Sequence, residues 1–596
     1  MCGIFGIIAD REQALGSILV EAGRRLSYRG YDSVGCATIH DDGTIDLRKD
    51  VGKVDEVAAR YHLAEMTGRR GIVQLRWATF GAPSPVNAQP HLDSDGDLVG
   101  AHNGNVVNNF ELRQQFIAEG MTVRSTNDGE SCVHAVERYV NKGDDMVEAI
   151  RRAYHDLAGD YAFVIGQVGE DKLYAFKKGS GLVAGIAEGF TCISSDLPSI
   201  LPLTRRILRV NDGEIVILQP DGLQLRRVED GSVIERETQE ITENMEAAAK
   251  GGYPHFMLKE IHEQPQVARE LIHLLDASRD VQPMVEWMMS ARHLYFVGCG
   301  TSYHACLLGA VYTGRLAGRP AIPILAPQFM VQYGNTLGPH DVGVFVSQSG
   351  ETKDVLNAMQ VAQRRGMSVL GLVNVIGSTL MNVSECYLPL GCGYEISVPA
   401  TKTFTNQALA FLYLALKMGN HSTGWLTCLP DLLEQTIAQV EPQVQALESA
   451  IVTHDDLYCL GYGLTYPIAL EGALKLKEVT YAHCEGMLST EFKHGPLSAV
   501  NQDYPVLFVA GPEDVPLLVS GINETTCRGG RAIAIGEEDA RLGANANDSI
   551  VLPRADPLVN PLLATMPLQL LSYRLSVARG HDPDFPRNLS KTLTVD

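Results

Sequence analysis

At 596 residues, the chain exceeds what one hydrophobic core usually organises, so we expect two to four domains. A formal charge of −22 argues against nucleic acid and against an anionic membrane as partners, because both are polyanions. The composition, 45% hydrophobic and 20% charged, is that of an ordinary soluble globular protein.

Twelve cysteines are scattered along the sequence without a CxxC pair or a Cys/His cluster at zinc spacing. This pattern indicates neither a disulfide framework nor a metal site, and it favours a reducing cytoplasm. The N-terminus lacks the basic start and apolar run of a secretory signal, and no segment approaches the roughly 18 apolar residues of a membrane span. We therefore expect a cytoplasmic protein.

The chain opens with a thiol one residue from its start, in Met1-Cys2-Gly3. Removal of one methionine would give Cys2 a free α-amino group, whose unperturbed pKa of about 8 suits a general base. A buried, inert cysteine is the alternative, because free Cys is among the most buried residue types. Cys2 is therefore a candidate nucleophile that the rest of the chain has to support.

Short β-type runs dominate the chain up to about residue 235, as at 71–75 and 98–101, and helical patterns occur near 12–26 and 129–141. This mixture predicts stacked sheets with helices outside. A charged stretch of small residues over 235–252 is typical of a linker. From Phe256 onward, helical patterns alternate with apolar strands, which indicates parallel α/β sheets.

The second part of the chain contains an internal repeat. Residues 294–303 recur at 457–466, each a strand entering a Gly-x-Gly turn and a helix, and residues 344–350 correspond to 506–512. Both pairs are separated by about 160 residues, so we predict two consecutive copies of one doubly wound domain.

The two copies differ in a loop that follows a buried strand. In the first copy the loop reads Ser-Gln-Ser-Gly-Glu-Thr over 347–352, and hydroxyls at a helix N-terminus can hold a phosphate monoester. A Ser/Thr-rich helix cap is the alternative. The second copy has Glu513 and Asp514 at the equivalent place, which would repel phosphate. One phosphate site per chain is expected.

The chain resembles the glutamine:fructose-6-phosphate amidotransferase family over its whole length, in the stretches MCGIFGI, YRGYDSVG, RWAT, HNG, CGTSY, SQSGET, TKTFTNQ, EGALKLKE, KHGPL and PRNLSKTLTVD. The resemblance implies an N-terminal-nucleophile (Ntn) αββα glutaminase sandwich followed by two doubly wound parallel-sheet sugar isomerase (SIS) domains. It implies a glutaminase over 1–238, a linker over 239–255, SIS domains over 256–430 and 431–585, and a tail over 586–596.

The resemblance also implies the reaction: D-fructose 6-phosphate and L-glutamine give D-glucosamine 6-phosphate and L-glutamate, without cofactor or metal. In the glutaminase, Cys2 would attack the glutamine amide, and Asn103 and Gly104 would form the oxyanion hole. Glutamine binding is assigned to Arg76, Trp77, Thr79 and Asp128, and Trp77 would also gate an ammonia channel. The alternatives are a surface ion pair for Arg76, a core side chain for Trp77 and a helix N-cap for Asp128.

In the isomerase half, the resemblance assigns the phosphate cradle to Thr301, Ser302, Ser347, Gln348, Ser349 and Thr352. Glu478 would move the proton between C1 and C2, and Lys475 would lie on the same face of a helix over 470–481. His494 would open the sugar ring, and Lys591 would form a Schiff base with the ketose. The alternative for the helix is a solvated Lys/Glu face.

The resemblance implies a homodimer through the SIS domains, with His494 reaching the partner's sugar pocket. The polar tail would be ordered by docking between domains. Phe80, Pro399 and Thr490 depart from the family pattern, which leaves open a different sugar phosphate or a deaminating or deglycating SIS isomerase with little glutamine use. A sugar-phosphate sensor with a vestigial glutaminase is a third hypothesis, which the retained Cys2 opposes.

Overall fold

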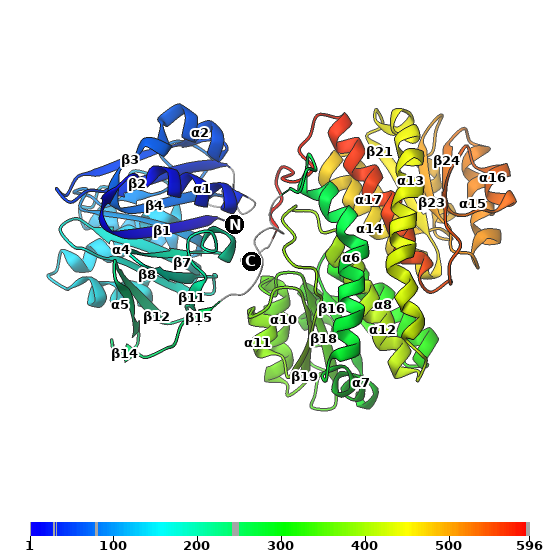
Figure 1. Cartoon of the computed structure of the whole chain (residues 1–596), viewed down its shortest axis with the longest axis horizontal. Coiled ribbons are helices and arrows are strands. Elements are labelled where there is room, and N and C mark those ends of the chain that lie inside the picture. Colours follow the sequence, from blue (N-terminus) through cyan, green and yellow to red (C-terminus); the bar gives the residue numbers. More distant parts are fainter. Residues whose placement is uncertain (1, 28–29, 31, 78–80, 241–249, 592–596) are drawn as a thin grey trace. The chain divides into compact units, whose positions relative to one another are not determined.

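The computed structural model describes residues 2–27, 30, 32–77, 81–240 and 250–591 (Figure 1). They form two compact units, one of the described residues up to 240 and the other of residues 250–591. Among the described residues, no helix combines the length and the apolar character needed to cross a membrane.

The first unit contains two sheets whose paired strands run antiparallel. The eight-stranded sheet has the order β15-β11-β9-β10-β1-β4-β2-β3, and the seven-stranded sheet has the order β14-β13-β12-β8-β7-β6-β5. The first sheet comprises β1 (Gly3–Gln13), β2 (Ser33–Ile39), β3 (Ile45–Val51), β4 (Gly68–Arg76), β9 (Val183–Ala187), β10 (Phe190–Ser194), β11 (Arg206–Arg209) and β15 (Gln239–Glu240). The second comprises β5 (His91–Leu92), β6 (Leu98–Val106), β7 (Gly159–Gln167), β8 (Leu173–Lys178), β12 (Glu214–Gln219), β13 (Gly222–Arg227) and β14 (Val233–Ile234).

The two sheets pack face to face through apolar side chains such as Ile4 and Ile72 on one side and Val164 on the other. Helices cover the outer faces: α1 (Gly16–Leu26) and α2 (Val54–Tyr61) on the first sheet, and α3 (Asn109–Ala118), α4 (Asp128–Val140) and α5 (Met146–Asp156) on the second. The predicted arrangement of stacked sheets with outer helices is therefore confirmed.

The second unit contains two five-stranded parallel sheets with the same topology. Their orders are β17-β16-β18-β19-β20 and β22-β21-β23-β24-β25. The strands are β16 (Leu294–Gly298), β17 (Ile322–Leu325), β18 (Val342–Ser347), β19 (Ser368–Val373), β20 (Cys386–Pro389), β21 (Asp456–Gly461), β22 (His483–Leu488), β23 (Pro505–Val509), β24 (Arg531–Glu537) and β25 (Asp548–Leu552). Numbered within each copy, both orders read 2-1-3-4-5, so the predicted repeat is confirmed.

Helices cover both faces of each parallel sheet, and one continuous apolar core joins the two copies. The helices are α6 (Phe256–Ala277), α7 (Val281–Ser290), α8 (Thr301–Ala317), α9 (Ala326–Tyr333), α10 (Lys353–Arg364), α11 (Thr379–Val383), α12 (Lys402–Met418), α13 (Leu429–Ile451), α14 (Tyr466–Thr480), α15 (Val515–Thr526), α16 (Ala540–Asn545) and α17 (Asn560–Ala578). Because both faces are covered, central strands such as β18 are buried along their whole length.

Two predicted helix starts need correction. The helix expected over 12–26 begins at Gly16, because β1 continues to Gln13. The helix expected over 470–481 begins at Tyr466, since Pro467 lies in its first turn, where proline is favoured. The predicted linker over 239–255 begins with β15, which pairs with β11, and its residues 241–249 lie outside the described residues.

Candidate active site

Cys2 directly precedes the central strand β1 of the first unit. Because Gly3 pairs with Leu75 near the end of β4, the chain brings Trp77 beside Cys2, and the backbone N–H of Trp77 donates to Cys2 Sγ at 3.3 Å. The side chain is buried. Burial raises the pKa of the Cys2 thiol, the nearby Arg76 charge opposes this, and Asp128 adds to it. The thiol is thus protonated at neutral pH and needs a base before it can attack.

Asn103 and Gly104 lie together on β6. The side chain of Asn103 is buried, and neither its Oδ1 nor its Nδ2 has a hydrogen-bond partner among the described residues. Gly104 has φ +104°, and a Cβ there would lie 2.0 Å from the carbonyl oxygen of Asp160, so only glycine fits. A buried amide without a partner is costly and needs an explanation, and a ligand oxygen would supply one.

Arg76 and Asp128 are also buried, so the surface ion pair considered for Arg76 is wrong. Arg76 Nη2 donates to the carbonyl oxygen of Gly81 at 2.7 Å. Asn127 caps α4 by accepting from Gly129 N, so the cap considered for Asp128 is wrong as well. Asp128 Oδ2 accepts from the backbone N–H of Val106 at 2.9 Å, while its buried Oδ1 lacks a hydrogen-bond partner within the described chain.

Sequence reasoning missed the residues that hold Asp128. His102 Nε2 lies 3.1 Å from Asp128 Oδ2, and the backbone N–H of His102 donates to Gln89 Oε1 at 2.7 Å. His102 immediately precedes Asn103 in the HNG stretch, so its position was a usable signal. The predicted glutamine-binding residue Thr79 and the departure at Phe80 lie outside the described residues.

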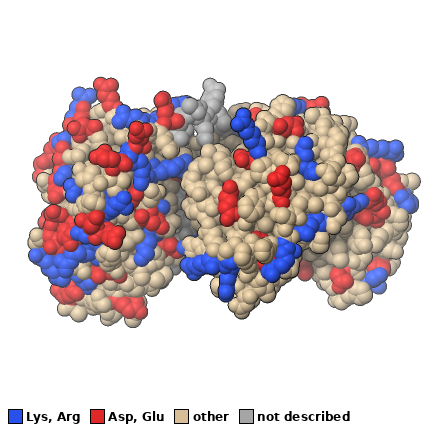
Figure 2. All heavy atoms as spheres, turned by 90° about the horizontal axis from the view of Figure 1, so that it is seen from below, with Lys and Arg blue, Asp and Glu red and all other residues tan. Residues whose placement is uncertain are grey.

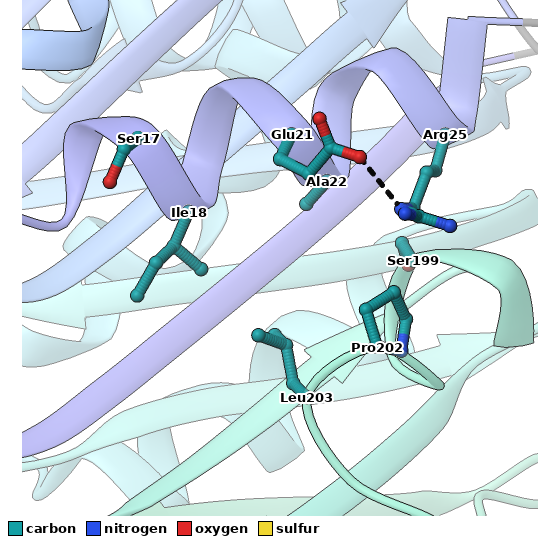
Figure 3. A pocket seen from close by; sticks show the side chains of 8 residues that line it. All are labelled: Ser17, Ile18, Glu21, Ala22, Arg25, Ser199, Pro202 and Leu203. Atoms are coloured by element: carbon teal, nitrogen blue, oxygen red, sulfur yellow. Dashed lines mark hydrogen bonds and ion pairs between the residues drawn. The ribbon is translucent and has the colours of Figure 1, made fainter.

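A separate pocket of about 180 Å³ lies between α1 and the segment 199–203 (Figure 3). It is lined by Ser17, Ile18, Glu21, Ala22, Arg25, Ser199, Pro202 and Leu203, and Arg25 Nε donates to Glu21 Oε1 at 3.0 Å. None of the predicted site residues lines this pocket. It is not part of the candidate site.

In the second unit, the predicted phosphate cradle lies at the carboxyl ends of the neighbouring strands β16 and β18. This edge is the topological switch point of a doubly wound sheet, where ligands bind. Ser347 Oγ accepts from Gly350 N at 3.0 Å and lies 3.0 Å from Thr352 Oγ1. Ser349 Oγ accepts from Glu351 N at 3.1 Å. These contacts shape a loop with several hydroxyls before α10.

The other predicted cradle residues lie around the same edge, with additional partners. Gln348 is half-buried, and its backbone carbonyl oxygen accepts from the backbone N–H groups of Asn374 and Val375, which follow β19. Ser302, at the start of α8, accepts from Gln407 Nε2 at 2.9 Å. Thr301 instead donates to Glu471 Oε1 at 3.0 Å, which ties this residue to the lysine and glutamate of α14.

Lys475 and Glu478 form an ion pair of 2.5 Å on α14, so their predicted common face is confirmed and the solvated-face alternative is wrong. Lys475 is buried and also lies 3.4 Å from Glu471 Oε1. Burial raises the pKa of Glu478, although the Lys475 charge opposes this. His304 Nδ1 lies 2.7 Å from Glu471 Oε2. Glu471 was missed, although it lies one helical turn before Lys475.

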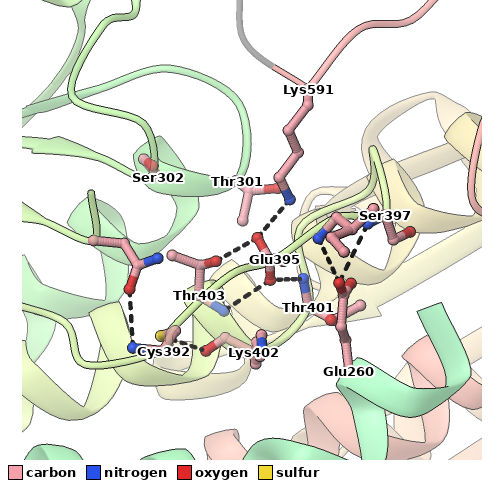
Figure 4. Close-up of polar contacts among 12 residues, drawn as sticks. Glu260, Thr301, Ser302, Cys392, Glu395, Ser397, Thr401, Lys402, Thr403 and Lys591 are labelled. Carbon is pink, nitrogen blue, oxygen red and sulfur yellow. Dashed lines mark hydrogen bonds and ion pairs between the residues drawn. The ribbon is translucent and has the colours of Figure 1, made fainter. Parts of the chain in front are cut away.

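The described part of the tail is held by residues of the second unit. Lys591 Nζ lies 2.5 Å from Glu395 Oε2 (Figure 4). Tyr481 Oη accepts from the backbone N–H of Arg587 at 2.8 Å, and the Arg587 guanidinium lies 4.1 Å from the centre of the Tyr481 ring. No local sequence pattern indicates the pairing with Glu395, which lies 196 residues from Lys591.

His494 is not brought into this group. It ends a short 3₁₀ helix (Phe492–His494), its side chain is exposed, and no hydrogen bond or ion pair links that side chain to another described residue. The partner-pocket prediction for His494 therefore stays a prediction. Pro399 is buried in the loop between Glu395 and α12, close in sequence to the residues that hold Lys591's partner.

Comparison with known proteins identifies both parts of the chain. A family model for a glutamine amidotransferase domain matches residues 76–200, and one for a SIS domain matches residues 288–417 and 451–579. The chain is thus a glutamine amidotransferase joined to two SIS domains. Curated proteins named glutamine–fructose-6-phosphate aminotransferase (isomerizing) are 40% identical over 601 residues in Methanothermobacter thermautotrophicus and 37% identical over 610 residues in Thermococcus kodakarensis, with 100% of each chain covered. The chain belongs to this family.

Solved structures match the second part of the chain. The C-terminal domain of glucosamine-fructose-6-phosphate aminotransferase from Francisella tularensis is 29% identical with a TM-score of 0.51, covering 56% of this chain and 99% of that one. Tagatose-6-phosphate ketose/aldose isomerase from Escherichia coli is 19% identical with a TM-score of 0.50, covering 56% and 95%. The latter likeness shows a shared fold. The predicted fold class is confirmed.

Proposed function

We propose that this chain converts D-fructose 6-phosphate and L-glutamine to D-glucosamine 6-phosphate and L-glutamate, the first step of hexosamine synthesis. One observation carries the proposal: the similarity to the named aminotransferases spans the full length of both chains, including the glutaminase and both SIS domains. The family's two half-reactions therefore each have a candidate site in this chain.

In the glutaminase half, the α-amine freed by removal of Met1 takes the thiol proton, and Cys2 attacks the glutamine amide. The buried Asn103 amide and the Gly104 backbone N–H stabilise the oxyanion. Arg76 binds the α-carboxylate of glutamine, and Asp128 binds its α-ammonium group through the oxygen that has no protein partner within the described residues. Thr79 assists binding, and Trp77 gates the ammonia that is released.

In the isomerase half, the hydroxyls of the cradle hold the sugar phosphate. His494 opens the ring, Lys591 condenses with the ketose, and ammonia then replaces the lysine. Glu478 moves a proton between C1 and C2, for which its raised pKa is suited. The buried Lys475 ammonium stabilises the negative charge that develops beside Glu478.

We further propose a cytoplasmic homodimer that pairs through the SIS domains, in which His494 completes the partner's site. The side chain of His494 is exposed and has no hydrogen-bond or ion-pair partner among the described residues, which supports this role. Figure 2 offers a second support, because wide areas of the second unit on this face lack Lys, Arg, Asp and Glu, whereas these residues are densely mixed over the first unit. The cores of protein interfaces are depleted in charged residues.

Mass analysis of the product tests the proposed substrate. Purified protein is incubated with glutamine and one sugar phosphate in each of three reactions. The sugar phosphates are fructose 6-phosphate, tagatose 6-phosphate and sedoheptulose 7-phosphate. We expect a hexosamine 6-phosphate only from fructose 6-phosphate. Faster conversion of another ketose phosphate would favour the alternative substrate, to which the departures at Pro399 and Thr490 point. Release of ammonia from glucosamine 6-phosphate without glutamine-dependent synthesis would favour a deaminating isomerase.

A further inference from the structure

The amine of Lys591, which the proposed function uses to form an imine, has a carboxylate built against it. Only 4% of the Lys591 side chain is exposed, and the Glu395 side chain is fully buried. Glu395 lies in the loop between β20 and α12, and Figure 4 shows Lys591 extending from the tail toward it. A buried ion pair is retained only when further hydrogen bonds satisfy its atoms, so the surroundings of Glu395 are informative.

The two carboxylate oxygens of Glu395 have different partners. Oε1 accepts from the backbone N–H groups of Thr401 and Thr403, at 2.9 and 3.0 Å. These groups belong to the start of α12, where the helix dipole favours a negative charge. Oε2 accepts from Thr403 Oγ1 and faces Lys591 Nζ. One oxygen is thus anchored to the helix, and the other is presented to the amine.

Of the described charged groups around Lys591, only Glu395 is placed as a negative charge against its amine, as the states of Glu260 and Lys402 show. Glu260 is buried beside it and accepts from the backbone N–H of Ile396 at 2.5 Å. Burial, and then the charge of Glu395, raise the pKa of Glu260 to about 8, so Glu260 is mostly protonated at neutral pH. The nearby ammonium of Lys402 is bound by Glu263 at 2.7 Å.

Glu395 itself stays ionised. Burial alone would raise its pKa, but the charge and hydrogen bond of Lys591 and the hydrogen bonds of Thr403 outweigh burial and lower the pKa to about 2. In the resting site, its carboxylate is therefore the negative charge that faces the Lys591 ammonium. Once Lys591 gives up its proton, the charge that does most to lower the pKa of Glu395 is lost while burial still raises it, so Glu395 can hold that proton while the imine forms.

Building on the proposed function, we propose that Glu395 is a catalytic residue that accepts a proton from Lys591 Nζ and then acts as the counter-ion of the protonated imine. Proton transfer to Oε2 frees the nitrogen lone pair, which forms a bond to C2 of the open-chain ketose while the carbonyl electron pair moves to oxygen. Two protons of the original ammonium leave with that oxygen as water. The carboxylate ends ionised, opposite the N–H of the iminium.

The competing explanation is that Glu395 has a purely structural role as the cap of α12. Substitution of Glu395 by glutamine distinguishes the two explanations. Glu395→Gln keeps an oxygen that can accept from Thr401 and Thr403, but it removes the charge that faces Lys591. Glu395→Asp keeps the charge and withdraws it by one methylene group. Glu263→Gln is the matched control, because it breaks the nearby ion pair with Lys402 without touching Lys591.

The experiment traps the imine on the full chain. Each variant is mixed with fructose 6-phosphate without glutamine, reduced with borohydride, and digested, and the sugar adduct on the Lys591 peptide is measured by mass against time. We expect the adduct to form about 100-fold more slowly in Glu395→Gln than in the parent, with Glu395→Asp between them. Glu263→Gln should match the parent.

Glu395→Gln forming the adduct at the parental rate would overturn this inference and leave the proposed function standing. Absence of the adduct in the parent would overturn both the role of Glu395 and the proposed function. Thermal unfolding and glutamine hydrolysis check that each variant is folded. Should Glu395→Gln not fold, Glu395→Asp is compared with Glu263→Asp instead, and equal rates in those two variants would overturn the inference.

Discussion

At the scale of single residues, the glutaminase site is marked by buried polar atoms that lack partners among the described residues. The Nδ2 of Asn103 and the Oδ1 of Asp128 are two such atoms. Leaving a buried polar atom unsatisfied costs about 1–3 kcal/mol, so a site that keeps two of them is arranged for a polar ligand. A bound glutamine would satisfy both, one through its amide oxygen and the other through its ammonium group.

Replacing Cys2 tests the nucleophile. Cys2→Ala should abolish glutamine-dependent synthesis, because the attacking sulfur is lost, while isomerisation of the sugar phosphate continues in the second unit. Intact mass should show that Met1 is absent from the active parent. Cys527→Ala, which removes an exposed thiol, is the control. A fully active preparation that retains Met1 would contradict the role of the terminal amine.

Glu260 predicts a dependence of stability on pH. An unfolded glutamate titrates near 4.5, whereas the pKa of Glu260 in the folded chain is raised to about 8 by burial and by Glu395. Between these values the folded state holds a proton that the unfolded state has released, so stability falls as pH rises through this window. As the pH rises from 5 to 8, the unfolding temperature of Glu260→Gln should therefore fall less than that of the parent. Parallel pH profiles for the two proteins would contradict this.

At the scale of elements, local patterns predicted secondary structure well where they were strong. The runs 71–75 and 98–101 lie in β4 and β6. The helices α2, α3 and α5 were missed; α3 has a polar sequence without a regular apolar face. The pairing of Lys591 with Glu395 could not be predicted, because no local pattern records a contact between a tail and a distant loop.

The tail is the element whose removal tests the isomerase site most sharply. Its described part contacts the second unit through Arg587 and Lys591. Deleting residues 590–596 should eliminate synthesis, leave basal glutamine hydrolysis measurable, and remove any stimulation of that hydrolysis by fructose 6-phosphate. Synthesis at near the parental rate in the truncated protein would contradict both the role of Lys591 and the coupling role of the tail.

At the scale of the whole molecule, the repeat was predictable, because two similar stretches far apart in one chain predict two similar domains. How a second chain completes the site is not predictable from one chain's packing, and the exposed His494 illustrates this. Mixing inactive His494→Ala and Glu478→Ala chains addresses the question. If His494 acts on the partner's site, about a quarter of the sites should recover after random exchange in a homodimer. No recovery after verified exchange would place both residues in one chain's site.

In the proposed reaction, nitrogen passes from glutamine to fructose 6-phosphate within this protein. Glutamine labelled with ¹⁵N in its side-chain amide is supplied with fructose 6-phosphate and an excess of unlabelled ammonium, and the amino sugar is analysed by mass. We expect glucosamine 6-phosphate that carries mainly ¹⁵N, and no ¹⁵N-labelled amino sugar from Cys2→Ala. An unlabelled amino sugar, or no amino sugar at all, would contradict it.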